Sequence, residues 1–202
     1  MQSKTVFFDI RNVLFFFHWE KLVEQLAAYC QTSIQEVEKT LKEHPWKEQY
    51  EQGTVDSWFL FHQLPSQIQG SKGFAGWMEA ISHIFTPNEL ILPLIKQLKQ
   101  NHVKLFTLSN ICEAHFSYAY THFPTLHLFD GHVLSYEVQV RAPDPQIYEK
   151  ALAKADARKE NSLYISAATD CIRQAKQLLI DSEAYVSPSV LQKTLQQKNY
   201  LP

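Results

Sequence analysis

Short continuous runs of apolar residues mark the strands expected in this chain. The first run, Thr5–Phe8, ends at Asp9 and opens into a turn. A continuous apolar run of this length is typical of a strand that helices cover on both faces. Asp9 is therefore predicted at the carboxyl end of the first strand, at the edge of an α/β sheet where ligands bind.

A helical pattern follows and fills residues 16–85. Apolar residues recur there at a spacing close to 3.6 residues, and all four tryptophans of the chain fall within it. We expect the tryptophans to form the core of a small four-helix bundle, with one or two of them lining a pocket over the strand ends. Gly53–Asp56 indicates a turn before one of the helices, with Thr54 as its N-cap.

Strands and helices alternate from residue 86 onward. A helix is expected to begin at Pro87. The further predicted strands lie at residues 103–108, 128–138, 162–165 and 184–186. Strands that alternate with helices predict an α/β fold of three layers around a parallel sheet. The predicted organisation is an α/β core of residues 1–15 and 86–202 with an inserted helical domain of residues 16–85.

Composition narrows the classes of function. The formal net charge is -2, and Lys and Arg are spread along the chain, so no nucleic-acid-binding surface is expected. No uncharged apolar run approaches the roughly 20 residues of a membrane span, and the first ten residues lack the order of a signal peptide. We therefore expect a soluble, cytoplasmic protein. Its three cysteines are far apart in the sequence and are expected as free thiols.

Motifs at several predicted strand ends resemble those of the haloacid dehalogenase-like (HAD) superfamily. The stretch from Asp9 to Leu14, Asp-Ile-Arg-Asn-Val-Leu, is similar to the first motif, and most of all to sugar-phosphate phosphatases that read Asp-x-Gly-Asn-Val. Three further landmarks follow in the family's order, Ser109-Asn110, Pro143-Asp144-Pro145 and Leu163–Ile165. The resemblance implies the Rossmann-like HAD fold with a small helical cap after the first strand.

The resemblance also implies a chemistry, which this chain retains only in part. In the family, an aspartate at the position of Asp9 accepts a phosphoryl group, and a hydroxyl at the position of Ser109 contacts the phosphate. The family's lysine is replaced here by Ala142, and the paired acids that hold Mg²⁺ are replaced by Ser166 and Ala167. Mg²⁺ prefers carboxylate oxygens, so no metal site or other cofactor is expected.

Arg11 stands where many members carry the acid that protonates the leaving group, and a guanidinium cannot do this because it stays charged. If the chain stays extended past Asp9, Arg11 lies on the same face of the strand. It would then balance charge without a metal, either by pairing with Asp9 or by reaching another acid. Arg11, Ser109 and Asn110 form the expected anion-binding site.

Other polar residues are weaker candidates. Asp170 is expected as a helix N-terminal acid, Arg141 is expected to point away from the site, and Cys112 is expected as an apolar filler. His115 and His122 lie seven residues apart on one predicted helix, without the partners that a metal site needs.

Two hypotheses about function remain. In the first, the chain is a HAD-like protein with impaired or absent catalysis that binds a small anion or a protein partner in the cleft between cap and core. In the second, it is an active hydrolase that cleaves a small phosphate ester through a covalent intermediate on Asp9, and only this hypothesis calls for Mg²⁺. The first places Arg11 or a neutral side chain at the metal position, and the second leaves an open polar cavity beside Asp9.

Overall fold

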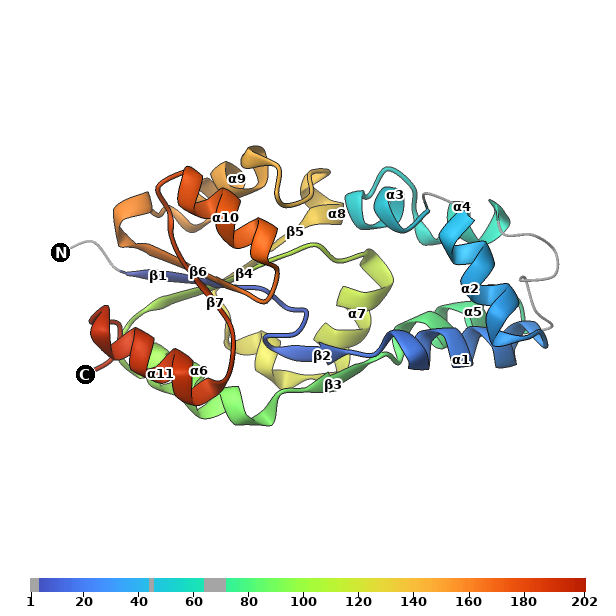
Figure 1. Ribbon diagram of the computed structural model, residues 1–202, viewed down its shortest axis with the longest axis horizontal. Helices are drawn as coiled ribbons and strands as arrows, with labels where there is room; N and C mark the ends of the chain where they lie inside the picture. The colour runs from blue at the N-terminus through green and yellow to red at the C-terminus, as the bar shows by residue number, and fades with distance from the viewer. Residues whose placement is uncertain (1–3, 44–45, 64–71) are drawn as a thin grey trace.

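The computed structural model describes residues 4–43, 46–63 and 72–202, and within these ranges five parallel strands form one sheet (Figure 1). Its strand order is β5-β4-β1-β6-β7. The strands are β1 (Thr5–Phe8), β4 (Lys104–Ser109), β5 (Gly131–Leu134), β6 (Ser162–Ser166) and β7 (Asp181–Ala184). The predicted parallel α/β fold is confirmed.

Helices cover both faces of the sheet and make the three layers. On one face lie α9 (Pro145–Ala155) and α10 (Thr169–Gln177), and on the other lie α6 (Leu92–Gln100) and α11 (Pro188–Gln197) (Figure 1). Strand β1 is buried along its whole length because it lies at the centre of the sheet under both helical layers. This explains its continuous apolar sequence.

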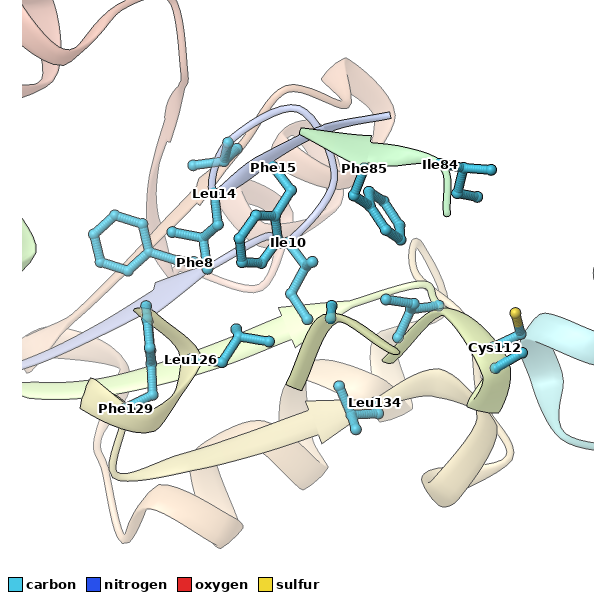
Figure 2. Packing of buried hydrophobic residues seen from close by; sticks show 14 of the residues in the cluster. Phe8, Ile10, Leu14, Phe15, Ile84, Phe85, Cys112, Leu126, Phe129 and Leu134 are labelled. Atoms are coloured by element: carbon cyan, nitrogen blue, oxygen red, sulfur yellow. The ribbon is translucent and has the colours of Figure 1, made fainter. Parts of the chain in front are cut away.

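The hydrophobic core extends past the end of β1 into the turn that follows it. Figure 2 shows Phe8, Leu14 and Phe15 directed toward the chain around Phe129. The rings of Phe8 and Phe129 meet edge to face, with centroids 5.9 Å apart. The segment after Asp9 is therefore held by packing, which fixes the backbone from which Asp9 and Arg11 project.

A helical lobe stands beyond the carboxyl ends of the strands (Figure 1). Its described residues form five helices, where the sequence pattern predicted four. They are α1 (Trp19–Cys30), α2 (Ile34–Glu43), α3 (Trp46–Gln52), α4 (Ser57–Gln63) and α5 (Gly73–Ser82). Residues 64–71 of the predicted helical domain lie outside the described residues.

The lobe and the sheet are joined by an antiparallel two-stranded ribbon that the sequence analysis missed. It consists of β2 (Phe15–Phe17) and β3 (Phe85–Pro87). The expected helix start at Pro87 is wrong because this residue ends β3, and α6 begins at Leu92 with a proline in its first turn. Aromatic contacts favour the ribbon: the Phe15 and Phe85 ring centroids are 6.3 Å apart.

Three other predicted boundaries differ from the structure. Asp56, not Thr54, caps α4, because its Oδ1 accepts a hydrogen bond from the Phe59 backbone N–H at 2.6 Å. The strand expected at residues 128–138 is confined to β5, and α8 (Ser135–Val138) follows it directly. The last strand, β7, ends at the residue where it was expected to begin.

Two expectations from composition can be compared with the structure. Cys30, Cys112 and Cys171 form no disulfide, as predicted, and all three are buried. In the described part of the chain, every helix is too short or too polar to cross a membrane.

Candidate functional site

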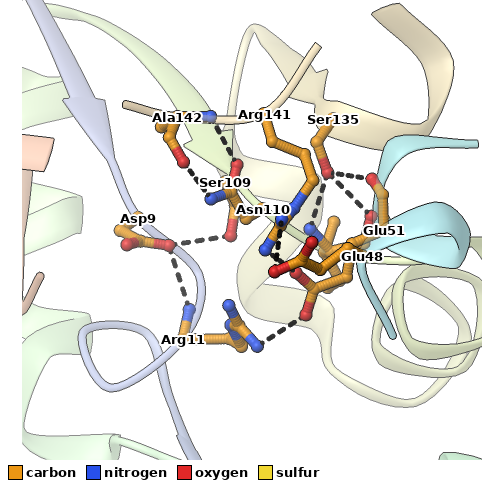
Figure 3. Close-up of polar contacts among 10 residues, drawn as sticks. Asp9, Arg11, Glu48, Glu51, Ser109, Asn110, Ser135, Arg141 and Ala142 are labelled. Carbon is orange, nitrogen blue, oxygen red and sulfur yellow. Dashed lines mark hydrogen bonds and ion pairs between the residues drawn. The ribbon is translucent and has the colours of Figure 1, made fainter. Parts of the chain in front are cut away.

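Asp9 lies directly after β1, where its backbone N–H donates to the Ile165 carbonyl at 2.8 Å. Its carboxylate is buried and accepts hydrogen bonds at both oxygens. Oδ1 accepts from the Ser109 hydroxyl at 2.7 Å and from the Arg11 backbone N–H at 3.3 Å (Figure 3). Oδ2 accepts from the Ser166 hydroxyl at 2.7 Å. Hydroxyls from the two strands that flank β1 therefore enclose the carboxylate.

Burial raises the pKa of Asp9 above its ordinary value. The two serine hydroxyls, the charge of Arg11 and the Arg11 backbone N–H lower this pKa, but the loss of water outweighs them. Neutral donors satisfy the hydrogen-bonding needs of a carboxylate without balancing its charge. Asp9 is consequently held in surroundings that favour its protonated form more than water does.

The Arg11 guanidinium turns away from Asp9. The chain does not stay extended after Asp9, because Asn12 adopts a left-handed conformation with φ of 58°. Arg11 Nη1 instead contacts Glu51 Oε1 at 2.9 Å (Figure 3). Of the two arrangements considered from the sequence, the structure contains the one in which Arg11 reaches another acid.

Glu51, near the end of α3, is the residue that sequence reasoning missed. Only 4% of its surface is exposed. Its Oε2 contacts Arg141 Nη2 at 2.7 Å, so one buried carboxylate from the helical lobe bridges two arginines from loops at the sheet edge. Arg141 was expected to point away from the Asp9 site, and its side chain is directed to Glu51, because a buried carboxylate needs a cationic partner. Glu51 lies 40 and 90 residues from these partners, so no local signal could have revealed the bridge.

Backbone contacts fix α3 against the core beside this bridge. The Ser135 hydroxyl donates to the Glu51 carbonyl. Gly53 has φ of +71°, and a Cβ at this position would lie 2.0 Å from the Tyr136 carbonyl oxygen. Glycine is required here both for the backbone conformation and for the close approach.

Asn110 supports the loop that carries Arg141. Its Nδ2 donates to the Ala142 carbonyl at 2.7 Å, and its Oδ1 accepts from the Ala142 N–H at 2.8 Å. Both ends of the side-chain amide are therefore engaged by backbone. The part expected for Asn110 in anion binding stays a prediction.

A cavity of about 120 Å³ lies beside the Arg11–Glu51 pair and within the helical lobe. Trp19, Trp46 and Trp77 line it, whereas Trp58 is 59% exposed and stands apart from the expected core. The other apolar residues that line the cavity are Phe17, Leu22, Leu26, Val37, Leu41, Tyr50, Leu60 and Ile81. The cavity is thus apolar along most of its surface and charged at the end where Arg11 and Glu51 lie.

Two potentially reactive side chains in the cavity wall are kept neutral. Burial, followed by the charge of Arg11, lowers the pKa of His115 to about 3, and burial raises the pKa of Cys112 to about 12. Cys112 therefore behaves as the apolar filler expected from the sequence. His122 stacks on Tyr118, with ring centroids 4.1 Å apart. Asp170 hydrogen-bonds the Cys171 backbone N–H at 2.9 Å at the start of α10.

The chain is similar to known proteins of one family. The family model of haloacid dehalogenase-like hydrolases matches residues 3–168. The chain belongs to this HAD family. A curated relative is the sesquiterpene phosphatase astK of Aspergillus oryzae, which is 27% identical over 164 residues, covering 80% of this chain and 79% of the relative.

Solved HAD structures share the fold. A HAD family enzyme of Bacteroides thetaiotaomicron, in complex with magnesium and inorganic phosphate, has a TM-score of 0.81 and 18% identity, with 92% of this chain and 95% of that chain covered. The L-2-haloacid dehalogenase of Xanthobacter autotrophicus has a TM-score of 0.66 and 14% identity, with 100% of this chain and 85% of that chain covered. These likenesses confirm the HAD fold, and the narrower resemblance to sugar-phosphate phosphatases stays a prediction.

The donor groups around Asp9 do not fit the Mg²⁺ ion that HAD phosphatases use. Where the family carries acids after the fourth core strand, this chain has Ser166 and Ala167, and the Ser166 hydroxyl points its hydrogen at Asp9. Among the residues that the structure describes, no three His, Cys, Asp or Glu side chains lie close enough together to hold a metal ion. Mg²⁺ needs several hard oxygen ligands, preferably anionic ones, and Asp9 alone does not supply them.

Proposed function

We propose that this chain is a HAD-family protein with impaired phosphoryl transfer that works by binding a small ligand or a protein partner in the cleft between the sheet and the helical lobe. One observation carries the proposal: the Asp9 carboxylate is enclosed by two serine hydroxyls, while the nearby arginines are paired with Glu51. Positive charge is present in the cleft, but Glu51 already engages it.

Electrostatics makes this arrangement unfavourable for attack on a phosphate ester. Two like charges 4 Å apart repel by about 4 kcal/mol at an effective dielectric constant near 20, and a phosphate dianion doubles that cost. HAD phosphatases offset the repulsion with a metal ion and a lysine. Here Ala142 and Ser166 occupy those positions, and the guanidinium of Arg11 is 2.9 Å from a competing carboxylate.

A turnover assay tests the proposal. A panel of phosphate monoesters, including sugar phosphates and an isoprenoid phosphate, is incubated with the wild type and with Asp9→Asn in the presence of Mg²⁺. We expect the two proteins to release phosphate at the same background rate, with a catalytically complete HAD phosphatase as positive control. Wild-type turnover that disappears in Asp9→Asn would reject impaired catalysis.

Metal binding gives a second, independent test. Because the donor set around Asp9 lacks carboxylate partners, we expect calorimetry to detect no binding of Mg²⁺ at millimolar concentration. Heat of binding that is lost in Asp9→Asn contradicts this expectation.

The second candidate function is an active phosphatase that uses Asp9 as its nucleophile. It is favoured by the retained contact between Asp9 and the Ser109 hydroxyl at 2.7 Å, and by the relative that is named as a sesquiterpene phosphatase. Its signature is a covalent aspartyl-phosphate on Asp9. Mass spectrometry after acid quench detects this adduct directly, and its absence across the panel counts against the candidate.

A further inference from the structure

The cavity in the helical lobe has the size of a small apolar ligand. Its volume is about 120 Å³, close to the roughly 150 Å³ of an apolar cavity that binds benzene. A body on the order of six carbon atoms therefore fits it. The surrounding side chains, such as Trp19, Leu26 and Trp77, offer such a body contacts without hydrogen-bonding demands.

The charged end of the cavity brings guanidinium groups together with one buried carboxylate. Arg11 and Glu51 both line the cavity, and Arg141 approaches Glu51 from the other side. Two guanidinium groups face the one buried carboxylate of Glu51, and the second acid near Arg141, Glu48, has a side chain that is 73% exposed. The Nε of Arg141 is buried and has no hydrogen-bond acceptor among the described residues. This guanidinium therefore has a free donor beside the one that Glu51 takes, and planar carboxylates bind such pairs of donors well.

Glu51 has an alternative partner within its own helix. Lys47 lies four residues earlier on α3, also lines the cavity and is exposed. A carboxylate and an ammonium at this spacing on a helix are close enough to pair. The Glu51 side chain can thus leave the arginines without becoming an isolated buried charge.

We propose that the cavity binds a small amphiphilic carboxylate, whose apolar body fills the cavity and whose carboxylate takes the place of the Glu51 carboxylate between Arg11 and Arg141. This inference rests on the proposed function, since it names the ligand class of the same cleft. A monocarboxylate exchanges with Glu51 without changing the charge of the site. A phosphate dianion adds a negative charge near the exposed Glu48, which lies 3.9 Å from Arg141.

Three probes separate the two parts of such a ligand. Pentanoate has both body and charge, 1-pentanol has the body alone, and acetate has the charge with almost no body. Calorimetry measures binding, and tryptophan fluorescence reports occupancy because three of the four tryptophans line the cavity. Each buried methylene contributes about 0.8 kcal/mol, so we expect pentanoate to bind more than tenfold more tightly than acetate. We also expect it to bind more than tenfold more tightly than 1-pentanol.

Variants with matched controls test each part of the site. Arg11→Gln is expected to remove the preference for pentanoate over 1-pentanol, while the exposed Arg173→Gln leaves it unchanged. Val37→Phe, which fills the cavity, is expected to weaken pentanoate binding more than tenfold, while the same change at the exposed Val186 has no effect.

Glu51→Gln tests the exchange itself. Gln keeps the shape of Glu51 and one acceptor oxygen, but its amide nitrogen cannot accept from the second arginine, and it no longer competes for the arginines as an anion. We expect it to bind pentanoate about tenfold more tightly than the wild type, and circular dichroism checks that the fold is retained. If Glu51→Gln is unfolded, the Arg11 and Val37 variants decide the outcome.

Several results overturn the inference. They are equal affinity for pentanoate and acetate, equal affinity for pentanoate and 1-pentanol, and no binding of pentanoate by folded wild type. The turnover assay is separate from these measurements. If the protein shows neither turnover nor pentanoate binding, impaired catalysis still stands and only the inference about the carboxylate ligand is rejected. If the protein shows turnover that depends on Asp9, the proposed function itself is rejected.

Discussion

Asp9 and Glu51 are two buried carboxylates in one cleft, and they differ in what faces them. Asp9 is enclosed by the hydroxyls of Ser109 and Ser166, which satisfy its oxygens but leave its charge unbalanced. Glu51 lies between two guanidinium groups, which satisfy its oxygens and also balance its charge. The comparison shows that the positive charge of the cleft has its partner on the helical lobe, away from the residue that the HAD family uses for chemistry.

The largest effect is expected from removing the compensated carboxylate. Glu51→Ala leaves two guanidinium groups without their anion, and we expect it to lower the free energy of unfolding by about 3 kcal/mol. This loss is at the low end of the range for breaking a buried ion pair, because the Arg11 and Arg141 side chains remain 24% and 26% exposed and water can partly solvate them. Urea denaturation measures the loss.

Glu48→Ala is the matched control for this variant. Glu48 lies on the same helix and faces Arg141 at 3.9 Å, but its side chain is 73% exposed. We expect it to cost less than about 0.5 kcal/mol. Similar losses of stability in the two variants would mean that the buried bridge at Glu51 contributes no more to stability than an exposed ion pair.

The position of α3, on which the Glu51 bridge depends, is tested next. Gly53→Ala places a methyl group against the Tyr136 carbonyl in a left-handed conformation, and we expect a loss of about 2 kcal/mol. Gly73→Ala is the control, since Gly73 also has positive φ but has no atom within 4 Å of the added Cβ. Only the smaller conformational cost, about 1 kcal/mol, is expected there. Equal losses in the two glycine variants would remove the close approach as a cause.

A second carboxylate beside Asp9 would make that site resemble its family. Ser166→Asp replaces a hydroxyl that lies 2.7 Å from Asp9 Oδ2, and without metal we expect a loss of roughly 1 to 2 kcal/mol, because one acid must bind a proton to relieve the repulsion. Millimolar Mg²⁺ is expected to restore stability through binding to the folded state. Thermal unfolding with and without Mg²⁺ measures this, and Ser166→Asn should show no response to the metal.

The smallest effect, and a gain, is expected at Asp9. Because the pKa of folded Asp9 lies above the ordinary value of 3.8, the folded chain holds this proton more tightly than the unfolded chain, and the ionised carboxylate disfavours folding at neutral pH. Asp9→Asn should therefore raise stability by about 1 kcal/mol at neutral pH.

The pH dependence checks the sign of this effect. As pH falls through the raised pKa, Asp9 becomes protonated in the folded state first, and below 3.8 it is protonated in both states. The advantage of Asp9→Asn should therefore shrink over this range and be lost below it. The exposed Glu24→Gln is the control and should change little at any pH. An Asp9→Asn variant that is less stable than wild type at neutral pH would show that the hydroxyl contacts outweigh the cost of burial.

Sequence reasoning succeeded where the signal is local. The apolar run of β1 and the polar residue that ends it place Asp9, and the run of β4 places Ser109 beside it, because neighbouring parallel strands end at one sheet edge. It failed where two distant segments decide the outcome. The ribbon of β2 and β3 and the bridge of Arg141 to Glu51 are pairings that no spacing along the chain reveals.

The ribbon that joins lobe and sheet has a topological consequence. Phe17 and Phe85 face each other at the lobe end of its antiparallel ladder, so the chain leaves and returns at neighbouring points. In these terms, the helical lobe is the loop of one very long β-hairpin. Loop-closure entropy grows only with the logarithm of loop length. The whole helical lobe can therefore be carried between these two phenylalanines at little more conformational cost than a shorter connection.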